Sequence, residues 1–175
     1  MLRMVSGRER FPERGLHLID IENLSGGAKP SFDQIRGVQR IYSGRLTFGP
    51  LDQVVVASSH LTLLSAALGW PHARYRVRSG PNGADLELLG ILEYEEVAAR
   101  FTRVIIGSGD GAFVRPAACL AAAGVEVIVV SRRDSLSSRL AIAASEVIHL
   151  EAAPSASVAA LDRGCTHWPA WPSNC

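Results

Sequence analysis

Residues 16–23 have the sequence Leu-His-Leu-Ile-Asp-Ile-Glu-Asn, in which an apolar run rich in branched side chains ends in two acids and an amide. This pattern is typical of a buried strand whose C-terminal tip delivers polar groups into a crevice. Two later strand-like runs also lead to an aspartate. The sequence therefore raises the question of whether three acids meet in the fold: Asp20, Asp85 and Asp110.

Apolar runs alternate with helix-forming stretches along most of the chain. After the first run we predict strands at 52–57, 72–78, 102–106, 125–130 and 147–150. Between them we predict helices at 32–42, 59–69, 84–100, 112–123 and 135–144. The strands are continuous apolar runs, which favours a parallel sheet buried on both faces. We therefore predict a doubly wound α/β fold in one domain, with helices on both faces of the sheet.

Composition divides the chain into three parts. Residues 1–14 are mostly polar and carry four arginines, so we expect a flexible N-terminal extension. Residues 15–150 carry the alternating pattern and form the predicted domain. Residues 151–175 shift to alanine, serine and proline without sustained periodicity, which indicates a flexible tail.

The bulk composition excludes several classes of protein. With 47% hydrophobic and 20% charged residues in a chain of 175, the protein has enough apolar material for a core. Its net charge of +1 gives no overall attraction to nucleic acid or membrane. We find no secretory signal and no span long enough for a bilayer, so we predict a cytoplasmic protein without a membrane. Cys119, in an apolar helical run, is predicted to be a small core residue.

The tail holds a second group of residues with possible chemistry. Cys165, His167 and Cys175 are poorly spaced for zinc and lack a fourth ligand, so we do not predict a zinc site. Trp168 and Trp171 instead indicate a segment that docks on the domain's own surface or on a partner. A homo-oligomer or a protein partner held through this tail is therefore a further expectation.

The three acids suggest a metal centre. The carboxyl ends of parallel strands meet at one edge of a sheet, so we expect the acids to share that edge. Grouped carboxylates repel one another, and Mg²⁺ or Mn²⁺ relieves the repulsion and can activate water against a phosphodiester. Asn23 and Ser108 could hold a metal-bound water or a phosphate oxygen. The alternative is that Asp85 and Asp110 only stabilise helix starts, whereas Asp20 has no evident local role of that kind.

Three motifs then resemble those of a known family, the NYN domains, a branch of the PIN-like nucleases. Residues 18–23 resemble the family's opening Asp-x-x-Asn signature, and residues 105–113, Ile-Ile-Gly-Ser-Gly-Asp-Gly-Ala-Phe, resemble its later Ser-Gly-Asp-x-Asp-Phe motif. Residues 82–85, Asn-Gly-Ala-Asp, look like its Lys-Gly-x-Asp helix start. The motifs occur in the expected order, and the resemblance covers residues 16–150.

The resemblance implies a Mg²⁺- or Mn²⁺-dependent endoribonuclease that cleaves RNA. The implied metal ligands are Asp20, Asp85 and Asp110, which act as catalytic residues together with Asn23. The chain departs from the family pattern, because Ala112 and Gly90 stand where further acids are usual and Asn82 replaces the lysine. Fewer acids imply weaker metal binding. The alternative is therefore a weakened or inactive NYN-like domain that binds RNA or protein.

Arginines could hold the RNA phosphates. We predict Arg76 and Arg78, on the wetter side of a rim strand, and Arg132 and Arg133, after a later strand, as substrate-binding residues. The alternative is that they are solvated surface arginines. A third possibility is an enzyme acting on a nucleotide or another small molecule, which the absence of Gly-x-Gly-x-x-Gly after the first strand disfavours.

Overall fold

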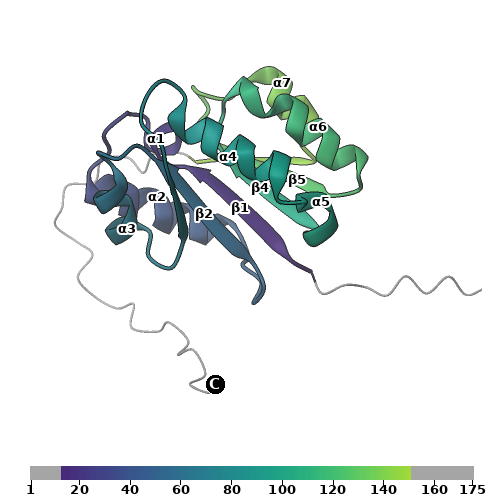
Figure 1. The fold of residues 1–175 in the computed structure, drawn as a ribbon, viewed down its shortest axis with the longest axis horizontal. Helices are drawn as coiled ribbons and strands as arrows, with labels where there is room; N and C mark the ends of the chain where they lie inside the picture. The colour runs from purple at the N-terminus through teal and green to yellow at the C-terminus, as the bar shows by residue number, and fades with distance from the viewer. Residues whose placement is uncertain (1–12, 151–175) are drawn as a thin grey trace, which may run out of the picture.

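A parallel sheet of six strands forms the centre of the computed structural model, which describes residues 13–150 (Figure 1). The strands are β1 (Gly15–Asp20), β2 (Gln53–Ser58), β3 (Arg74–Val77), β4 (Arg103–Gly107), β5 (Glu126–Ser131) and β6 (Glu146–His149). Their order in space is β3-β2-β1-β4-β5-β6, and every pair is parallel. The chain builds from β1 outward to β3 and then returns to the other side of β1. The predicted doubly wound α/β fold is confirmed.

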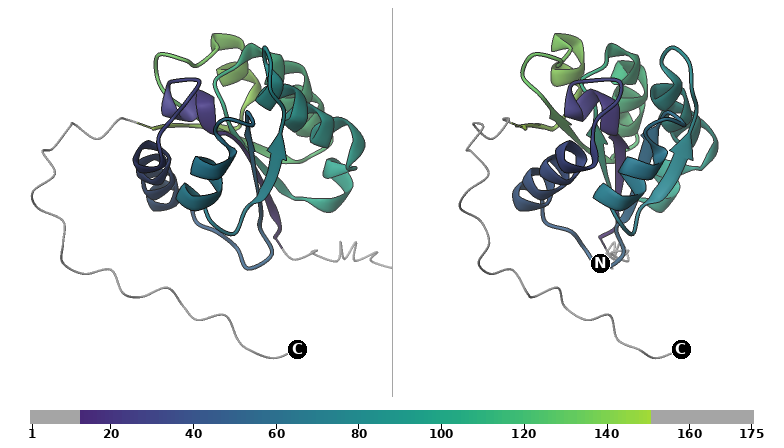
Figure 2. Two further views of the ribbon diagram at one scale, coloured as in Figure 1. Left: turned by 60° about the vertical axis from the view of Figure 1, so that its left-hand side comes forward. Right: turned by 90° about the vertical axis from the view of Figure 1, so that its left-hand side faces the viewer.

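Helices cover both faces of the sheet (Figure 2). The first face carries α4 (Gly83–Tyr94), α5 (Val97–Arg100), α6 (Val114–Ala122) and α7 (Ser138–Ala143). The second face carries α1 (Ile21–Ser25), α2 (Phe32–Arg45) and α3 (Leu63–Gly69). Side chains of β1 alternate between the two cores: Leu16 and Leu18 pack on the first, and Ile19 packs on the second. The first strand therefore anchors both layers.

Four local predictions were wrong. The helix α1 follows β1 without a loop, which we did not predict. The helix predicted at 84–100 is divided, because Glu96 adopts a left-handed φ of 49° between α4 and α5. Helix α2 runs past Gly44 to its end at Arg45. Cys119, predicted as a core residue, is exposed.

The described range begins close to the predicted domain boundary. Arg14, from the predicted N-terminal extension, donates its backbone N–H to Thr102 Oγ1 at 3.1 Å. Residues 1–12 of that extension and the whole predicted tail, with Cys165, Cys175, Trp168 and Trp171, lie outside the described residues. Within residues 13–150, no helix has the length and apolar character needed to cross a membrane.

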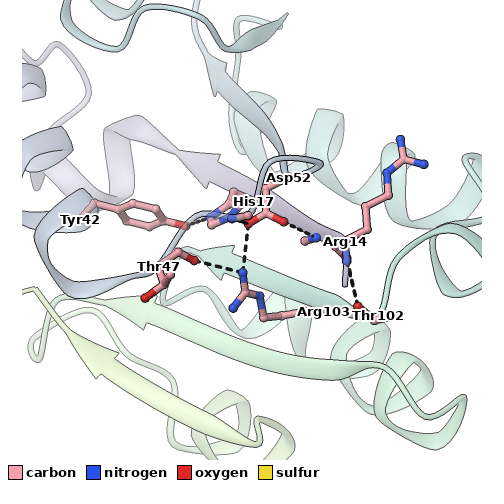
Figure 3. Close-up of polar contacts among 9 residues, drawn as sticks. Arg14, His17, Tyr42, Thr47, Asp52, Thr102 and Arg103 are labelled. Atoms are coloured by element: carbon pink, nitrogen blue, oxygen red, sulfur yellow. Dashed lines mark hydrogen bonds and ion pairs between the residues drawn. The ribbon is translucent and has the colours of Figure 1, made fainter. Parts of the chain in front are cut away.

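A buried polar network holds the start of β1 (Figure 3). The Asp52 carboxylate accepts hydrogen bonds from Gly15 N at 2.6 Å, Gly49 N at 2.8 Å and Arg103 Nη2 at 3.0 Å. His17 lies between this carboxylate and a tyrosine: its Nε2 is 3.3 Å from Asp52 Oδ2, and its Nδ1 is 2.9 Å from Tyr42 Oη. The network fixes the end of β1 farthest from Asp20, so both ends of the strand are anchored by side chains.

Candidate active site

A pocket of about 490 Å³ opens at the carboxyl edge of the sheet, where the strand order reverses beside β1. Asp20 comes from the tip of β1, Asp85 from the first turn of α4, and Asp110 from the loop after β4. All three predicted acids line this one pocket. The other charged and amide side chains of its lining are Glu22, Asn23, Arg78, Asn82, Arg132 and Asp134.

Asp20 has a local structural role that the sequence did not reveal. It is the N-cap of α1, and its Oδ1 accepts hydrogen bonds from Glu22 N at 3.1 Å and Asn23 N at 3.0 Å. Our interpretation that Asp20 lacks such a role was wrong, since the chain enters α1 directly from the strand. The side chain is 5% exposed, and burial raises the pKa of its carboxyl despite the two N–H donors.

Asp85 is positioned by an unusual helix start. Asn82 adopts a left-handed φ of 56°, and Gly83 follows it as the first residue of α4. A Cβ on Gly83 would lie 2.2 Å from the carbonyl oxygen of Arg78, so only glycine allows this approach. The helix therefore begins pressed against the backbone that leaves β3, and its first turn brings Asp85 to Asp20.

The environment of Asp85 disfavours a free carboxylate. The side chain is 8% exposed, and its Oδ1 has no hydrogen-bond partner among the residues described. Burial raises the pKa of Asp85 to about 7, helped by the charges of Asp20 and Asp110 and by a hydrogen bond with the Asp20 carboxyl. Asp85 is thus influenced by both other acids, and its raised pKa favours the protonated form of its carboxyl group below about pH 7.

Asp110 acts as a cap, as the alternative interpretation proposed. Its Oδ1 accepts a hydrogen bond from Ala112 N at 2.7 Å and caps the 3₁₀ turn Gly111–Phe113. Its own N–H donates to Ser108 Oγ at 3.2 Å. Ser108 is fully buried and does not line the pocket. In this structure Ser108 orients the loop that carries Asp110.

Asn23 connects two sides of the pocket. Its Oδ1 accepts a hydrogen bond from Gly109 N at 3.1 Å, which ties α1 to the loop after β4. A Cβ on Gly109 would lie 2.2 Å from the carbonyl oxygen of Ser135, so this loop is also packed closely against the chain that follows β5. The loop bearing Asp110 is therefore held on two sides.

The four predicted substrate arginines separate into two groups. Arg78 and Arg132 line the pocket. Arg132 forms an ion pair with Asp134 and lies so close to Gly26 that a Cβ there would meet its guanidinium. Arg76 and Arg133 do not line the pocket.

Glu95, the residue that caps the end of α4, forms ion pairs with two arginines of β3. Arg76 Nη2 is 3.0 Å from Glu95 Oε1, and Arg74 also pairs with this carboxylate. The two arginines are therefore partly neutralised. The alternating sequence pattern predicted that both arginines lie on one face of an edge strand. It could not reveal that they pair with Glu95, which comes after the intervening helix α4.

Two further acids in the lining were not predicted as site residues. Glu22 Oε1 accepts hydrogen bonds from Ser59 N and Thr62 Oγ1, both at 2.9 Å, and so joins α1 to the chain before α3. Asp134 pairs with Arg132. The only available signal for each was its nearness in sequence to a predicted residue, Asp20 for the first and Arg132 for the second.

The donor set suits a hard divalent cation, although the acids are not gathered tightly. Within residues 13–150, no three His, Cys, Asp or Glu side chains lie close enough together to hold a metal ion. The pocket nevertheless offers carboxylate oxygens from three elements and one unpaired, buried oxygen on Asp85. Mg²⁺ commonly binds through one or two carboxylates and completes its shell with water and phosphate. The residues present fit that mode.

Comparison with known proteins gives a family and a fold. A family model described as NYN domain matches residues 18–151. A crystal structure of a protein of unknown function from Vibrio parahaemolyticus RIMD 2210633 superposes with a TM-score of 0.55 at 15% sequence identity. The alignment covers 79% of this chain and 93% of that one, so the similarity concerns the fold alone. No curated protein matches the sequence.

Proposed function

The chain belongs to the NYN domain family of the PIN-like superfamily, and on that premise we propose that it is a metal-dependent ribonuclease that hydrolyses RNA phosphodiester bonds. One observation carries the proposal: the buried carboxyl of Asp85, with an unpaired oxygen, lies against Asp20 at the reversal of strand order. Burying an unpaired acid beside others is unfavourable for folding alone. A cation bound between the carboxyl groups of Asp20 and Asp85 would offset the unfavourable burial of these acids.

Asp20 and Asp85 are the residues that would hold the cation, and Asp110 lines the same pocket without being gathered closely enough to complete a three-carboxylate site. A divalent ion bound there would supply the Lewis acid that polarises the phosphoryl group and activates the attacking water. Asp85 must first lose its proton, and its pKa of about 7 makes this step depend on pH in the neutral range. Asn23 contributes by holding the Asp110 loop in place.

Arg78 and Arg132 are the groups that would bind the RNA phosphates. They face a pocket with five acidic side chains, so without a bound cation the pocket carries a net negative charge when the acids are ionised. A phosphodiester would be repelled by such a surface unless a cation is bound. We therefore expect productive RNA binding in the pocket to require the metal as well as the arginines.

The test is cleavage of RNA by the purified full chain in the presence of Mn²⁺ or Mg²⁺. We expect cleavage that EDTA abolishes and that falls at least about 100-fold in Asp20→Asn and Asp85→Asn. Asp33→Asn is the matched control, because Asp33 is exposed on α2 and does not line the pocket. Cleavage that survives in Asp85→Asn, or no cleavage of any RNA with either ion, would refute the proposal.

A second candidate is a domain of this family that binds RNA without cleaving it. It is favoured by the engagement of Asp110 as a cap beside Ala112, where the family motif has an acid. This candidate predicts RNA binding that weakens with salt and with Arg78→Gln, but no cleavage in either metal. If Asp110→Asn lowers cleavage while RNA affinity is retained, the catalytic proposal stands and the binding-only candidate fails.

A further inference from the structure

A second cavity lies between α2 and α3, and it shares no lining residue with the acid pocket. Its volume is about 840 Å³. The walls are mainly apolar, with an aromatic ring from each of three segments; they include Phe32, Leu46, Phe48, Val54, Leu68 and Trp70. We call this cavity the aromatic groove. Phe48 is 38% exposed and Leu68 is 62% exposed, so its apolar surface is open to solvent.

The aromatic walls are held in place by the polar network at the start of β1. The Phe48 ring stacks on the His17 ring at a centroid distance of 4.5 Å and an interplanar angle of 8°. The Tyr42 ring meets the Trp70 ring edge-on at 5.1 Å, and its hydroxyl is hydrogen-bonded to His17. Two rings of the groove, those of Phe48 and Trp70, are therefore fixed through neighbouring buried side chains. A rigid groove of this kind loses little entropy when it binds a ligand.

The chain leaves the domain on the side of the sheet that carries the groove. Leu150, the last described residue, is 5% exposed and packs in the same hydrophobic core as Trp70 and Tyr42. Seventeen residues lie between it and Trp168, a tether that reaches about 60 Å when extended. A domain of this size has a radius of gyration of only about 14 Å. Any point of the groove is within reach.

Residues 168–172 have the sequence Trp-Pro-Ala-Trp-Pro. Prolines favour the polyproline II conformation, which has three residues per turn. In that conformation Trp168 and Trp171 would project on the same side, about 9 Å apart. Proline-rich segments with this geometry bind aromatic-lined grooves, because little entropy is lost on binding. The segment therefore offers the shape and chemistry that the aromatic groove would accept.

We propose that residues 168–172 dock in the aromatic groove of their own chain and cover its apolar surface. The tether favours the chain's own segment over a free partner, since linkers of this kind give an effective concentration of about millimolar. This inference does not depend on the proposed nuclease activity, because the groove and the acid pocket lie on different parts of the fold.

The test uses the full chain labelled with 5-fluorotryptophan, whose three signals are assigned with Trp168→Phe and Trp171→Phe. A soluble paramagnetic chelate broadens the signal of each exposed tryptophan. We expect Trp168 and Trp171 to be broadened severalfold less in the wild type than in Leu68→Glu. The control is Leu64→Glu: Leu64 is 72% exposed on the same helix but does not line the groove, so this variant should behave as the wild type.

Three outcomes would overturn the proposal. The first is equal broadening of Trp168 and Trp171 in the wild type and in Leu68→Glu. The second is equal loss of protection in Leu68→Glu and Leu64→Glu, which would indicate a general surface effect. The third is protection that weakens on dilution, which would place the segment on a second copy of the chain. Leu68 is largely exposed, so unfolding of Leu68→Glu is not expected, and circular dichroism checks this.

Discussion

The carboxyl group of Asp85, at the start of α4, interacts with that of Asp20, at the end of β1, and this interaction contributes to the raised pKa of Asp85. Asp20 also accepts two backbone N–H groups, whereas one oxygen of Asp85 has no partner in the described structure. Backbone donors stabilise the ionised form of a carboxyl group. We therefore expect a proton held by this pair to reside mainly on Asp85.

The pH dependence of stability should reveal this proton. Asp85 has a pKa of about 7 in the folded chain and 3.8 as its ordinary value, so the folded state binds more protons between these limits. Its contribution to stability therefore falls as the pH rises from 3.8 to about 7. Asp85→Asn removes this loss and should stabilise the protein by about 1–3 kcal/mol at pH 8.

The measurement is urea denaturation of the wild type and Asp85→Asn at pH 5 and pH 8, with Asp33→Asn as the control. The difference between Asp85→Asn and the wild type should be larger at pH 8. Comparing differences is necessary because other groups, His17 among them, change the absolute stability with the opposite sign. If the difference in unfolding free energy between Asp85→Asn and the wild type is the same at both pH values, the raised pKa assigned to Asp85 is wrong.

Divalent cations should stabilise the folded protein. An ion at 100 times its dissociation constant stabilises by about 2.7 kcal/mol if it binds only the folded state. We expect Mn²⁺ to raise the melting temperature of the wild type, more at pH 8 than at pH 6, because binding must displace the proton from Asp85. Asp20→Asn and Asp85→Asn should lose this increase, and EDTA should reverse it. If Mn²⁺ raises the melting temperature of both variants as much as that of the wild type, the ion binds elsewhere.

The sheet could be predicted from the sequence because each strand is a local run of apolar residues. The failures come from features that such runs do not encode. Helix α1 has only five residues, too few to show a helical period, and its start depends on a cap by Asp20. The break after α4 occurs at Glu96, without a glycine or proline to mark it. In both cases the surrounding fold determines the backbone conformation.

The grouping of Asp20, Asp85 and Asp110 around one pocket followed from the geometry of parallel strands. Their individual roles did not, because hydrogen-bond partners depend on contacts between distant segments. Arg76 illustrates the limit: its partner Glu95 lies 19 residues away at the far end of a helix. A local pattern shows that a strand has a charged face, but it cannot show whether that face is neutralised.

The network around Asp52 should make the protein sensitive to acid. Burial acts to raise the pKa of Asp52, but hydrogen bonds from Gly49 N, Gly15 N and His17 outweigh it and hold the pKa below 3.8. Its contribution is present above 3.8 and is lost as the pH falls through the folded-state pKa. Burial also lowers the pKa of His17, so its contribution is lost as the pH falls below 6.5.

Asp52→Asn should destabilise the protein by about 2–4 kcal/mol at pH 7, since it leaves buried donors without a charged acceptor. The loss should shrink as the pH falls below 3.8, where the wild-type carboxylate becomes protonated. Urea titrations at several pH values check this. Mn²⁺ affinity of the folded variant should be unchanged, because Asp52 lies at the other end of β1. A stability equal to the wild type at pH 7 would disprove the structural role of the network.

Two glycines of α4 offer a matched pair of substitutions. A Cβ on Gly83 would lie 2.2 Å from the carbonyl oxygen of Arg78, whereas a Cβ on Gly90 would meet nothing within 4 Å. Gly83→Ala should therefore displace the start of the helix and Asp85 with it, at a cost of about 1–3 kcal/mol. Gly90→Ala should stabilise the helix by about 0.5–1 kcal/mol. Denaturation measures the change in stability, and Mn²⁺ titration measures the change in ion affinity. Only Gly83→Ala should lower the affinity for Mn²⁺. Wild-type affinity in that variant would show that the position of Asp85 does not depend on this contact.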